Sequence, residues 1–225
     1  MACLFPIEHH HLVGRLTTRW SRPGQPGVEF GAILVLAGRA AHLEAVRRTH
    51  GLEDGQMKKA ELLTLVAFNT WANRRILAKA ARLAPRALHG KANLSYPSPI
   101  ATLVHVLDTQ WYWREGIQVG ILPSRPLIPA DFPSLHALRR RWDEEDRLLL
   151  GYLSSRTQRQ VDGNVTYTWR QARPRTRPLW HIITHVVNHG TQHRTELAVF
   201  LTAKKLSPRN MDFLDYIRHK TNART

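Results

Sequence analysis

The sequence predicts an all-α protein, an up-down four-helix bundle preceded by a poorly structured N-terminal extension. Two observations predict this fold class. From residue 57 onward, apolar residues recur at steps of three and four along four long segments, which is the period of amphipathic helices. Proline, glycine or serine stands near the ends of these segments, as expected at helix termini. Helices joined in this way bury their apolar stripes by packing on one another as a bundle.

Each element can be assigned from its own residues. The four long helices are expected over residues 58–83, 99–117, 134–153 and 178–205. Ser134 can cap the third of them, and Pro99 and Pro178 stand at first turns, where proline is favoured. Residues 160–177 alternate loosely between apolar and polar side chains, which predicts a short strand or hairpin. A short terminal helix is expected over residues 212–219.

Residues 1–56 differ from the rest of the chain. They contain seven of the 13 glycines, and no helical or strand period runs through their first half. A secretory signal fits badly, because the apolar stretch is short and follows Pro23 and Pro26, whereas a transit peptide stays open. We therefore expect residues 1–56 to be an extension that precedes a metal-binding domain over residues 57–219. The simplest hypothesis is that the start is mis-assigned and that Met57 is the natural first residue.

Composition excludes several classes of protein. The single cysteine, Cys3, excludes a disulfide framework and any multi-cysteine zinc or iron–sulfur site. The lack of disulfides suits a reducing compartment, so we expect a cytoplasmic location. No stretch approaches the roughly 18 apolar residues that a membrane span needs. With 13 histidines in the chain, imidazole and carboxylate must supply any metal ligands.

The net charge of +16 would ordinarily suggest nucleic acid or an anionic membrane surface as a partner. The 26 arginines and seven lysines are, however, scattered along the chain rather than gathered in one long basic run. No zinc-finger or RNA-recognition signature accompanies them. We therefore expect neither nucleic acid nor a membrane as the main partner, and a small-molecule substrate instead.

Histidine recurs every four residues in the fourth helix, in the segment HIITHVVNHGTQHR, as His181, His185, His189 and His193. Steps of four advance by about 400°, so neighbours lie on one face, about 6 Å apart along the axis, and can bind one ion. The core-facing stripe comprises Ile182, Val186, His189, His193, Leu197 and Phe200. His189 and His193 therefore stand where apolar residues belong, and without partners their burial would be costly.

A metal site on this pair needs a third protein ligand and an open position for water or substrate. His105, in the segment LVHVLDTQWYW of the second helix, is the best candidate, although a lone histidine there is more often a hydrogen-bonded core residue. His185, one turn before the pair and slightly off the stripe, is expected to line the pocket or to support the ligands.

Four segments together resemble the DinB family of small helical metalloproteins (DinB/YfiT-like). They are FNTWANRRIL, LVHVLDTQWYW, PLWHIITHVVNHGTQHRTEL and SPRNMDFLDYI, and the resemblance covers about residues 57–219. It implies a four-helix bundle in which His105, His189 and His193, matched by motif position, hold one divalent metal ion. We expect zinc or nickel, with iron or copper as alternatives, since imidazole suits all four. The resemblance also implies a homodimer.

The resemblance points further to a metal-dependent transferase or isomerase that uses a low-molecular-weight thiol and acts on small electrophiles. The thiol must come from a cosubstrate, because Cys3 lies outside the predicted bundle. The open metal position is expected to face a pocket lined by Trp111, His185 and Arg194. Arg194 would either steer an acidic cosubstrate or be a solvated helix arginine.

Two alternatives stay open. A metal-dependent hydrolase would use a metal-bound water and a general base near the ion. Asp108, one turn after His105, and Glu196, three residues after His193, are the nearest candidates for that base. The other alternative is a protein without catalytic activity, either a structural metal module or a nucleic-acid-binding bundle.

Overall fold

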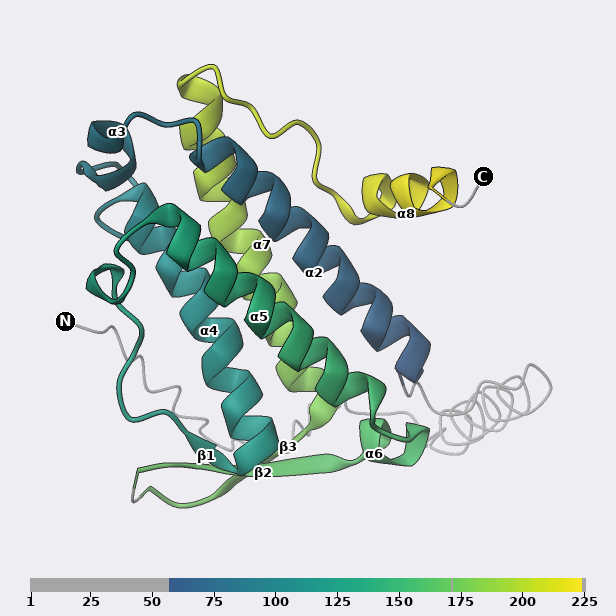
Figure 1. The fold of residues 1–225 in the computed structure, drawn as a ribbon. Coiled ribbons are helices and arrows are strands. Elements are labelled where there is room, and N and C mark those ends of the chain that lie inside the picture. Colours follow the sequence, from purple (N-terminus) through teal and green to yellow (C-terminus); the bar gives the residue numbers. More distant parts are fainter. Residues whose placement is uncertain (1–56, 171, 224–225) are drawn as a thin grey trace, which may run out of the picture. The chain divides into compact units, whose positions relative to one another are not determined.

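The structure, a computed structural model, describes residues 57–170 and 172–223, and the expected extension over residues 1–56 lies outside these residues. The described part is mostly helical, as predicted, but it also contains a small three-stranded sheet that an all-α fold class omits (Figure 1). The helices are α2 (Lys59–Ala80), α3 (Pro85–His89), α4 (Pro99–Val119), α5 (Leu135–Ser154), α6 (Gln158–Asp162), α7 (Leu179–Ala203) and α8 (Phe213–Asn222), with one 3-10 turn, η1 (Pro129–Asp131). The strands are β1 (Ile121–Leu122), β2 (Asn164–Trp169) and β3 (Arg175–Pro178). No helix in this part of the chain has both the length and the apolar content to cross a bilayer.

The four longest helices, α2, α4, α5 and α7, form where the apolar period predicts them, and local caps set several of their ends. The Ser98 hydroxyl accepts the N–H of Ala101 at the start of α4, and Ser134 accepts that of Ala137 at the start of α5. α4 ends at Gly120, whose φ of 80° lies in the left-handed region that glycine adopts without strain.

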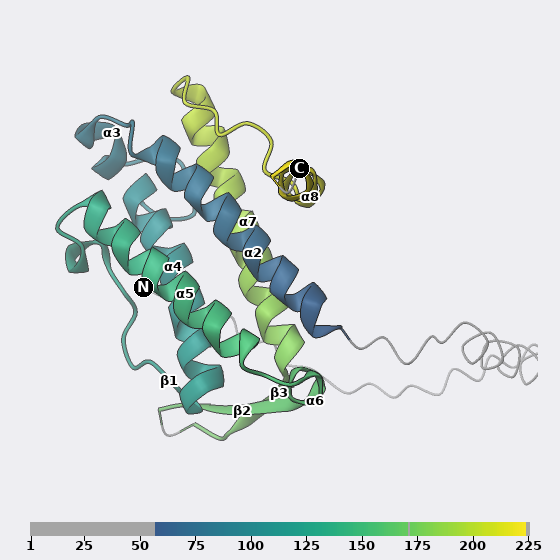
Figure 2. The same cartoon turned by 45° about the vertical axis from the view of Figure 1, so that its right-hand side comes forward.

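The direction of the helices differs from the expected up-down alternation. One apolar cluster contains residues from the C-terminal halves of α2 and α7 and the N-terminal halves of α4 and α5, and a second cluster contains the opposite halves. α2 and α7 therefore run one way, and α4 and α5 the other (Figures 1 and 2). The alternating order is wrong because residues 121–134 lead back along the helices before α5 begins (Figure 1). Fourteen extended residues reach about 46 Å, more than the roughly 32 Å length of α4.

Side chains of the four long helices make the core. α2 and α4 each pack against both α5 and α7. Among the residues with apolar side chains on these helices, Leu103, Leu107, Trp142 and Val186 are buried. Trp71 and Phe200 are only partly buried. Trp71 lies against α8, with its ring centroid 5.6 Å from that of Tyr216, because α8 covers this face of α2.

The sheet lies at one end of the long helices (Figure 1). β2 pairs antiparallel with β3, with Tyr167 opposite Arg175, which confirms the predicted hairpin, although residues 160–162 of the predicted range belong to α6. β1 follows α4 directly and pairs parallel with β2, with Ile121 opposite Thr168. The sequence did not predict β1, since two residues carry no recognisable period.

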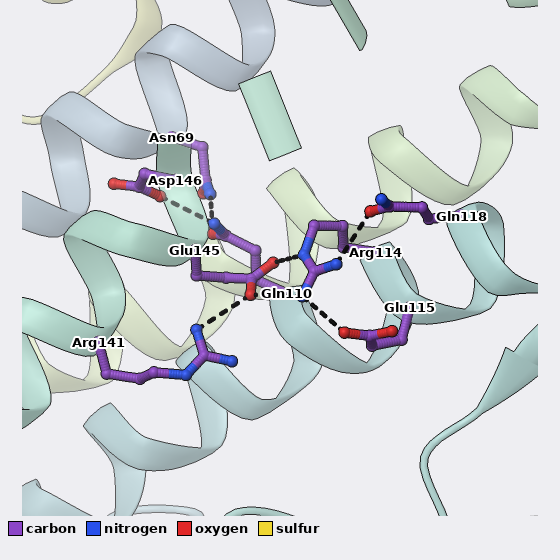
Figure 3. Close-up of polar contacts among 8 residues, drawn as sticks. All are labelled: Asn69, Gln110, Arg114, Glu115, Gln118, Arg141, Glu145 and Asp146. Atoms are coloured by element: carbon purple, nitrogen blue, oxygen red, sulfur yellow. Dashed lines mark hydrogen bonds and ion pairs between the residues drawn. The ribbon is translucent and has the colours of Figure 1, made fainter. Parts of the chain in front are cut away.

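A buried polar layer crosses the interior, and it comprises Asn69 of α2, Gln110 of α4, Asp146 of α5 and Arg194 of α7. On each helix, the residue of the polar layer lies between the segment that belongs to one apolar cluster and the segment that belongs to the other. Gln110 donates to Asp146 (2.8 Å) and accepts from Asn69 (3.1 Å), which itself accepts from Arg194. Figure 3 shows the first three residues beside a buried ion pair between Arg114 and Glu145. One hydrogen-bonded chain thus joins all four long helices.

Candidate metal centre

Three histidines from two helices converge. His105 lies on α4, whereas His189 and His193 lie one turn apart on α7, which packs against α4. One ring nitrogen of each lies within 4.8 Å of the other two, and the Nε2 atoms of His105 and His189 are 2.9 Å apart. The ring centroids are separated by 4.6 to 4.9 Å. The structure therefore brings together the three residues that the sequence singled out as ligands.

The environment keeps two of these imidazoles neutral. Burial, and then repulsion by His193, lowers the pKa of His105 to about 4. Burial, reinforced by the neighbouring histidines and by Arg194, lowers the pKa of His189 to about 3. Near neutral pH both rings therefore have a free nitrogen lone pair, which a metal ligand requires.

One of the two ring nitrogens of His189 has no hydrogen-bond partner among the described residues. This atom, Nδ1, is buried, whereas the Nε2 atom faces another imidazole. An unsatisfied buried polar atom is costly. A divalent cation fits this site, because zinc, nickel, iron and copper all accept neutral imidazole ligands.

The loop before α4 covers one side of the histidines. The ring of Tyr96 stacks on His105, with 4.1 Å between centroids, and meets His193 edge-on at 5.7 Å. Ser95 donates its hydroxyl and its backbone N–H to the two carboxylate oxygens of Glu196, at 2.6 and 3.2 Å. One of these oxygens, Oε2, lies 3.4 Å from Nδ1 of His193. Glu196 therefore connects the loop to the ring of His193.

Both carboxylates considered as general bases have other partners. Burial alone would raise the pKa of Glu196, but hydrogen bonds from Ser95 and the contact with His193 hold it below its usual value. Asp108 accepts the N–H of Leu127 at 2.7 Å. Burial raises the pKa of Asp108 to about 6 despite this hydrogen bond. Asp108 therefore holds the connection between α4 and α5.

His185 lies at the edge of the group, and its tryptophan neighbour differs from the expected one. Its exposed ring is 5.7 Å from that of His189 and 5.6 Å from that of Trp113. The expected neighbour was Trp111, which is half-buried. Helical geometry could have pointed to Trp113, which is about 80° around α4 from His105, whereas Trp111 is about 120° away in the opposite sense.

Arg194 points into the interior, toward α2, rather than into solvent. It is 3% exposed and donates to the side-chain oxygens of Asn69, Asn73 and Thr191. Burial lowers the pKa of Arg194 to about 10, and attraction by Asp146 opposes this shift. A guanidinium held in this way does not suit the expected steering of a cosubstrate. The repeat in α7 alone could not reveal this position, because it depends on α2 packing there.

Ser95 and Tyr96 were missed by sequence reasoning. They stand in a loop, where no period indicates the direction of a side chain, and their contacts depend on how the loop folds over α7. No signal in the sequence could have identified them.

The arrangement can hold one cation. In the described part of the chain, the group contains three ligand side chains. Three protein ligands with an open fourth position are typical of catalytic zinc sites, whereas structural sites use four.

The profile of the DinB family matches residues 56–224 of this chain. No curated protein matches the chain. The family match covers far more than half of the sequence and includes all three histidines, and the chain therefore belongs to the DinB family.

Proposed function

We propose that this DinB protein binds one divalent metal ion through His105, His189 and His193. The observation that carries the proposal is the convergence of three imidazoles from α4 and α7, two of them neutral and one with a buried nitrogen that lacks a partner. For the metal we propose zinc or nickel, with iron or copper as alternatives, since neutral imidazole can bind all four.

We further propose that the centre serves a thiol-dependent transferase that acts on small electrophiles. When bound, the metal would supply a Lewis acid that favours the deprotonated form of an incoming thiol. The described residues contain no cysteine, so the thiol belongs to a cosubstrate. Around the site, Glu196 orients the ring of His193 and Tyr96 shields the ring of His105. His185, which contacts Trp113, lies beside His189.

The partners of the nearby carboxylates favour this activity over the hydrolase alternative. A hydrolase needs a carboxylate free to take a proton from water. Glu196 is engaged by Ser95 and His193, and Asp108 by Leu127. A transferase that receives a thiol with a lowered pKa has less need of such a base.

As its scaffold, we propose a four-helix bundle over residues 57–219, with α2 and α7 antiparallel to α4 and α5, that assembles as a homodimer in the cytoplasm. Light scattering at micromolar concentration tests the dimer. A monomer there would contradict it.

The proposed reaction is tested with cobalt-substituted protein. Elemental analysis first establishes the metal content of the purified protein. Low-molecular-weight thiols are then added, and a sulfur-to-cobalt charge-transfer band is expected, together with metal-dependent conjugation or isomerisation of small electrophiles. If thiols leave the spectrum unchanged while esters or amides are hydrolysed, the hydrolase alternative replaces the transferase.

A further inference from the structure

Asn69 uses both ends of its side-chain amide in the interior. It is 2% exposed, its Nδ2 donates to Oε1 of Gln110 at 3.1 Å, and its Oδ1 accepts from Nη1 of Arg194. It belongs to FNTWANRRIL, a segment that the resemblance singled out but that supplies no metal ligand. Asn73 of the same segment also accepts from Arg194, at 2.7 Å, but no hydrogen bond joins its Nδ2 to another described residue.

The two partners of Asn69 lie on the two helices that carry the histidines. Gln110 follows His105 by five residues on α4, which is about 7.5 Å along the axis. Arg194 directly follows His193 on α7. Asn69 therefore connects α4 to α7 close to the level at which their histidines meet.

Gly190, the residue after His189, makes room for this connection. A Cβ atom at position 190 would lie 2.6 Å from Nη1 of Arg194 and 2.8 Å from Oδ1 of Asn69. The hydrogen bond between these side chains therefore lies directly against the backbone of α7, between the two ligands of that helix. Any side chain there must displace one of the two groups.

We propose that Asn69 is a positioning residue that, through Gln110 and Arg194, fixes the distance between His105 on α4 and the histidine pair on α7. The inference rests on the proposed metal site. Its physical reason is that apolar side chains pack with little directional preference, whereas buried hydrogen bonds are satisfied in one register only. Because apolar clusters lie on either side, the hydrogen bonds of the polar layer fix the position of α4 relative to α7 near the histidines.

The test compares Asn69→Leu with Asn73→Leu in the full chain. Both asparagines are buried in α2 and accept from Arg194, but only Asn69 reaches α4. Cobalt affinity is measured by chelator competition, and the cobalt absorption spectrum reports the ligand geometry. We expect Asn69→Leu to weaken affinity by about tenfold or more, with an altered spectrum, and Asn73→Leu to stay within about threefold of the wild type.

A second measurement needs no metal. The nitrogen NMR signals of the imidazoles in the metal-free protein report the contact between His105 and His189. They should shift in Asn69→Leu and stay unchanged in Asn73→Leu. If Asn69→Leu does not fold, Gly190→Ala takes its place, because alanine favours the helix while it displaces the same two groups.

The outcomes separate the two proposals. If both asparagine variants bind cobalt with the affinity of the wild type, and the imidazole signals are unchanged, the positioning role is overturned and the metal site stands. A wild-type chain that binds no cobalt would overturn the metal site, and the imidazole signals would then decide the positioning role alone.

Discussion

The histidine group and the polar layer lie on the same two helices, α4 and α7, yet they differ in how far their polar atoms are satisfied. In the polar layer, Arg194 donates to three acceptors, and Gln110 both donates and accepts. In the histidine group, two nitrogens face each other and the Nδ1 atom of His189 has no hydrogen-bond partner among the described residues. A satisfied buried network supports structure, whereas an unsatisfied one with neutral donor atoms is prepared for a ligand.

The largest expected effect is the loss of metal from the histidine group. His189→Ala combined with His193→Ala removes two of the three ligands, so stoichiometric metal should disappear in elemental analysis. His185→Ala is the matched control from the same helix and should weaken binding less, because His185 lies outside the group of ligands. Full metal retention in the double variant would refute the ligand assignment.

A large stability effect is expected in the polar layer. Arg194→Leu leaves the oxygens of Asn69 and Asn73 buried without their donor, which should lower the free energy of unfolding by about 3 kcal/mol in urea titrations. The control is Arg139→Leu on α5, an exposed residue 3.9 Å from Asp143, with an expected change within about 0.5 kcal/mol. Equal changes in the two variants would show that the layer contributes no more than a surface pair.

Asp146 gives the polar layer a pH dependence. Burial raises its pKa to about 6, against the hydrogen bonds from Gln110 and Thr70 that lower it. Between about pH 4 and 6 the folded protein retains a proton that the unfolded chain has lost, so stability falls as the pH rises through this window.

Because burial raises this pKa from 3.8 to about 6, the free energy of unfolding at neutral pH is lower by up to about 3 kcal/mol. Asp146→Asn should remove this decrease. The free energy of unfolding of the variant, measured in urea titrations, should therefore rise relative to that of the wild type as the pH increases from 4 to 7. A constant difference between the two proteins across this range would contradict the raised pKa.

The smallest expected effects compare two helical glycines. Gly151 of α5 has open space where a Cβ would lie, so Gly151→Ala should stabilise the protein by about 0.5 to 1 kcal/mol through helix propensity. Gly190→Ala makes the same chemical change against Asn69 and Arg194, and it should instead destabilise by about 1 kcal/mol. Thermal unfolding measures both changes in stability. If both variants change stability in the same direction, Asn69 and Arg194 can move aside for the added methyl group at little cost.

Much of the candidate site could be predicted because it depends on local geometry. His189 and His193 share a helix face whatever surrounds them, since a step of four residues nearly completes a turn. Their place on an apolar stripe indicated burial, and the motif position of His105 supplied the third residue. The caps at Ser98 and Ser134 act within one turn, so the long helices also begin where their residues indicate.

The tertiary structure decided what depends on how separate segments meet. The parallel course of α4 and α5 follows from the path of the connection between them, which no helical period encodes. The burial of Arg194, the stacking of Tyr96 on His105 and the bridge through Asn69 each require a partner far away in the sequence. The sequence by itself thus determined which residues can bind a metal, and packing determined which residues hold them in place, because hydrogen bonds between helices exist only once their faces are in contact.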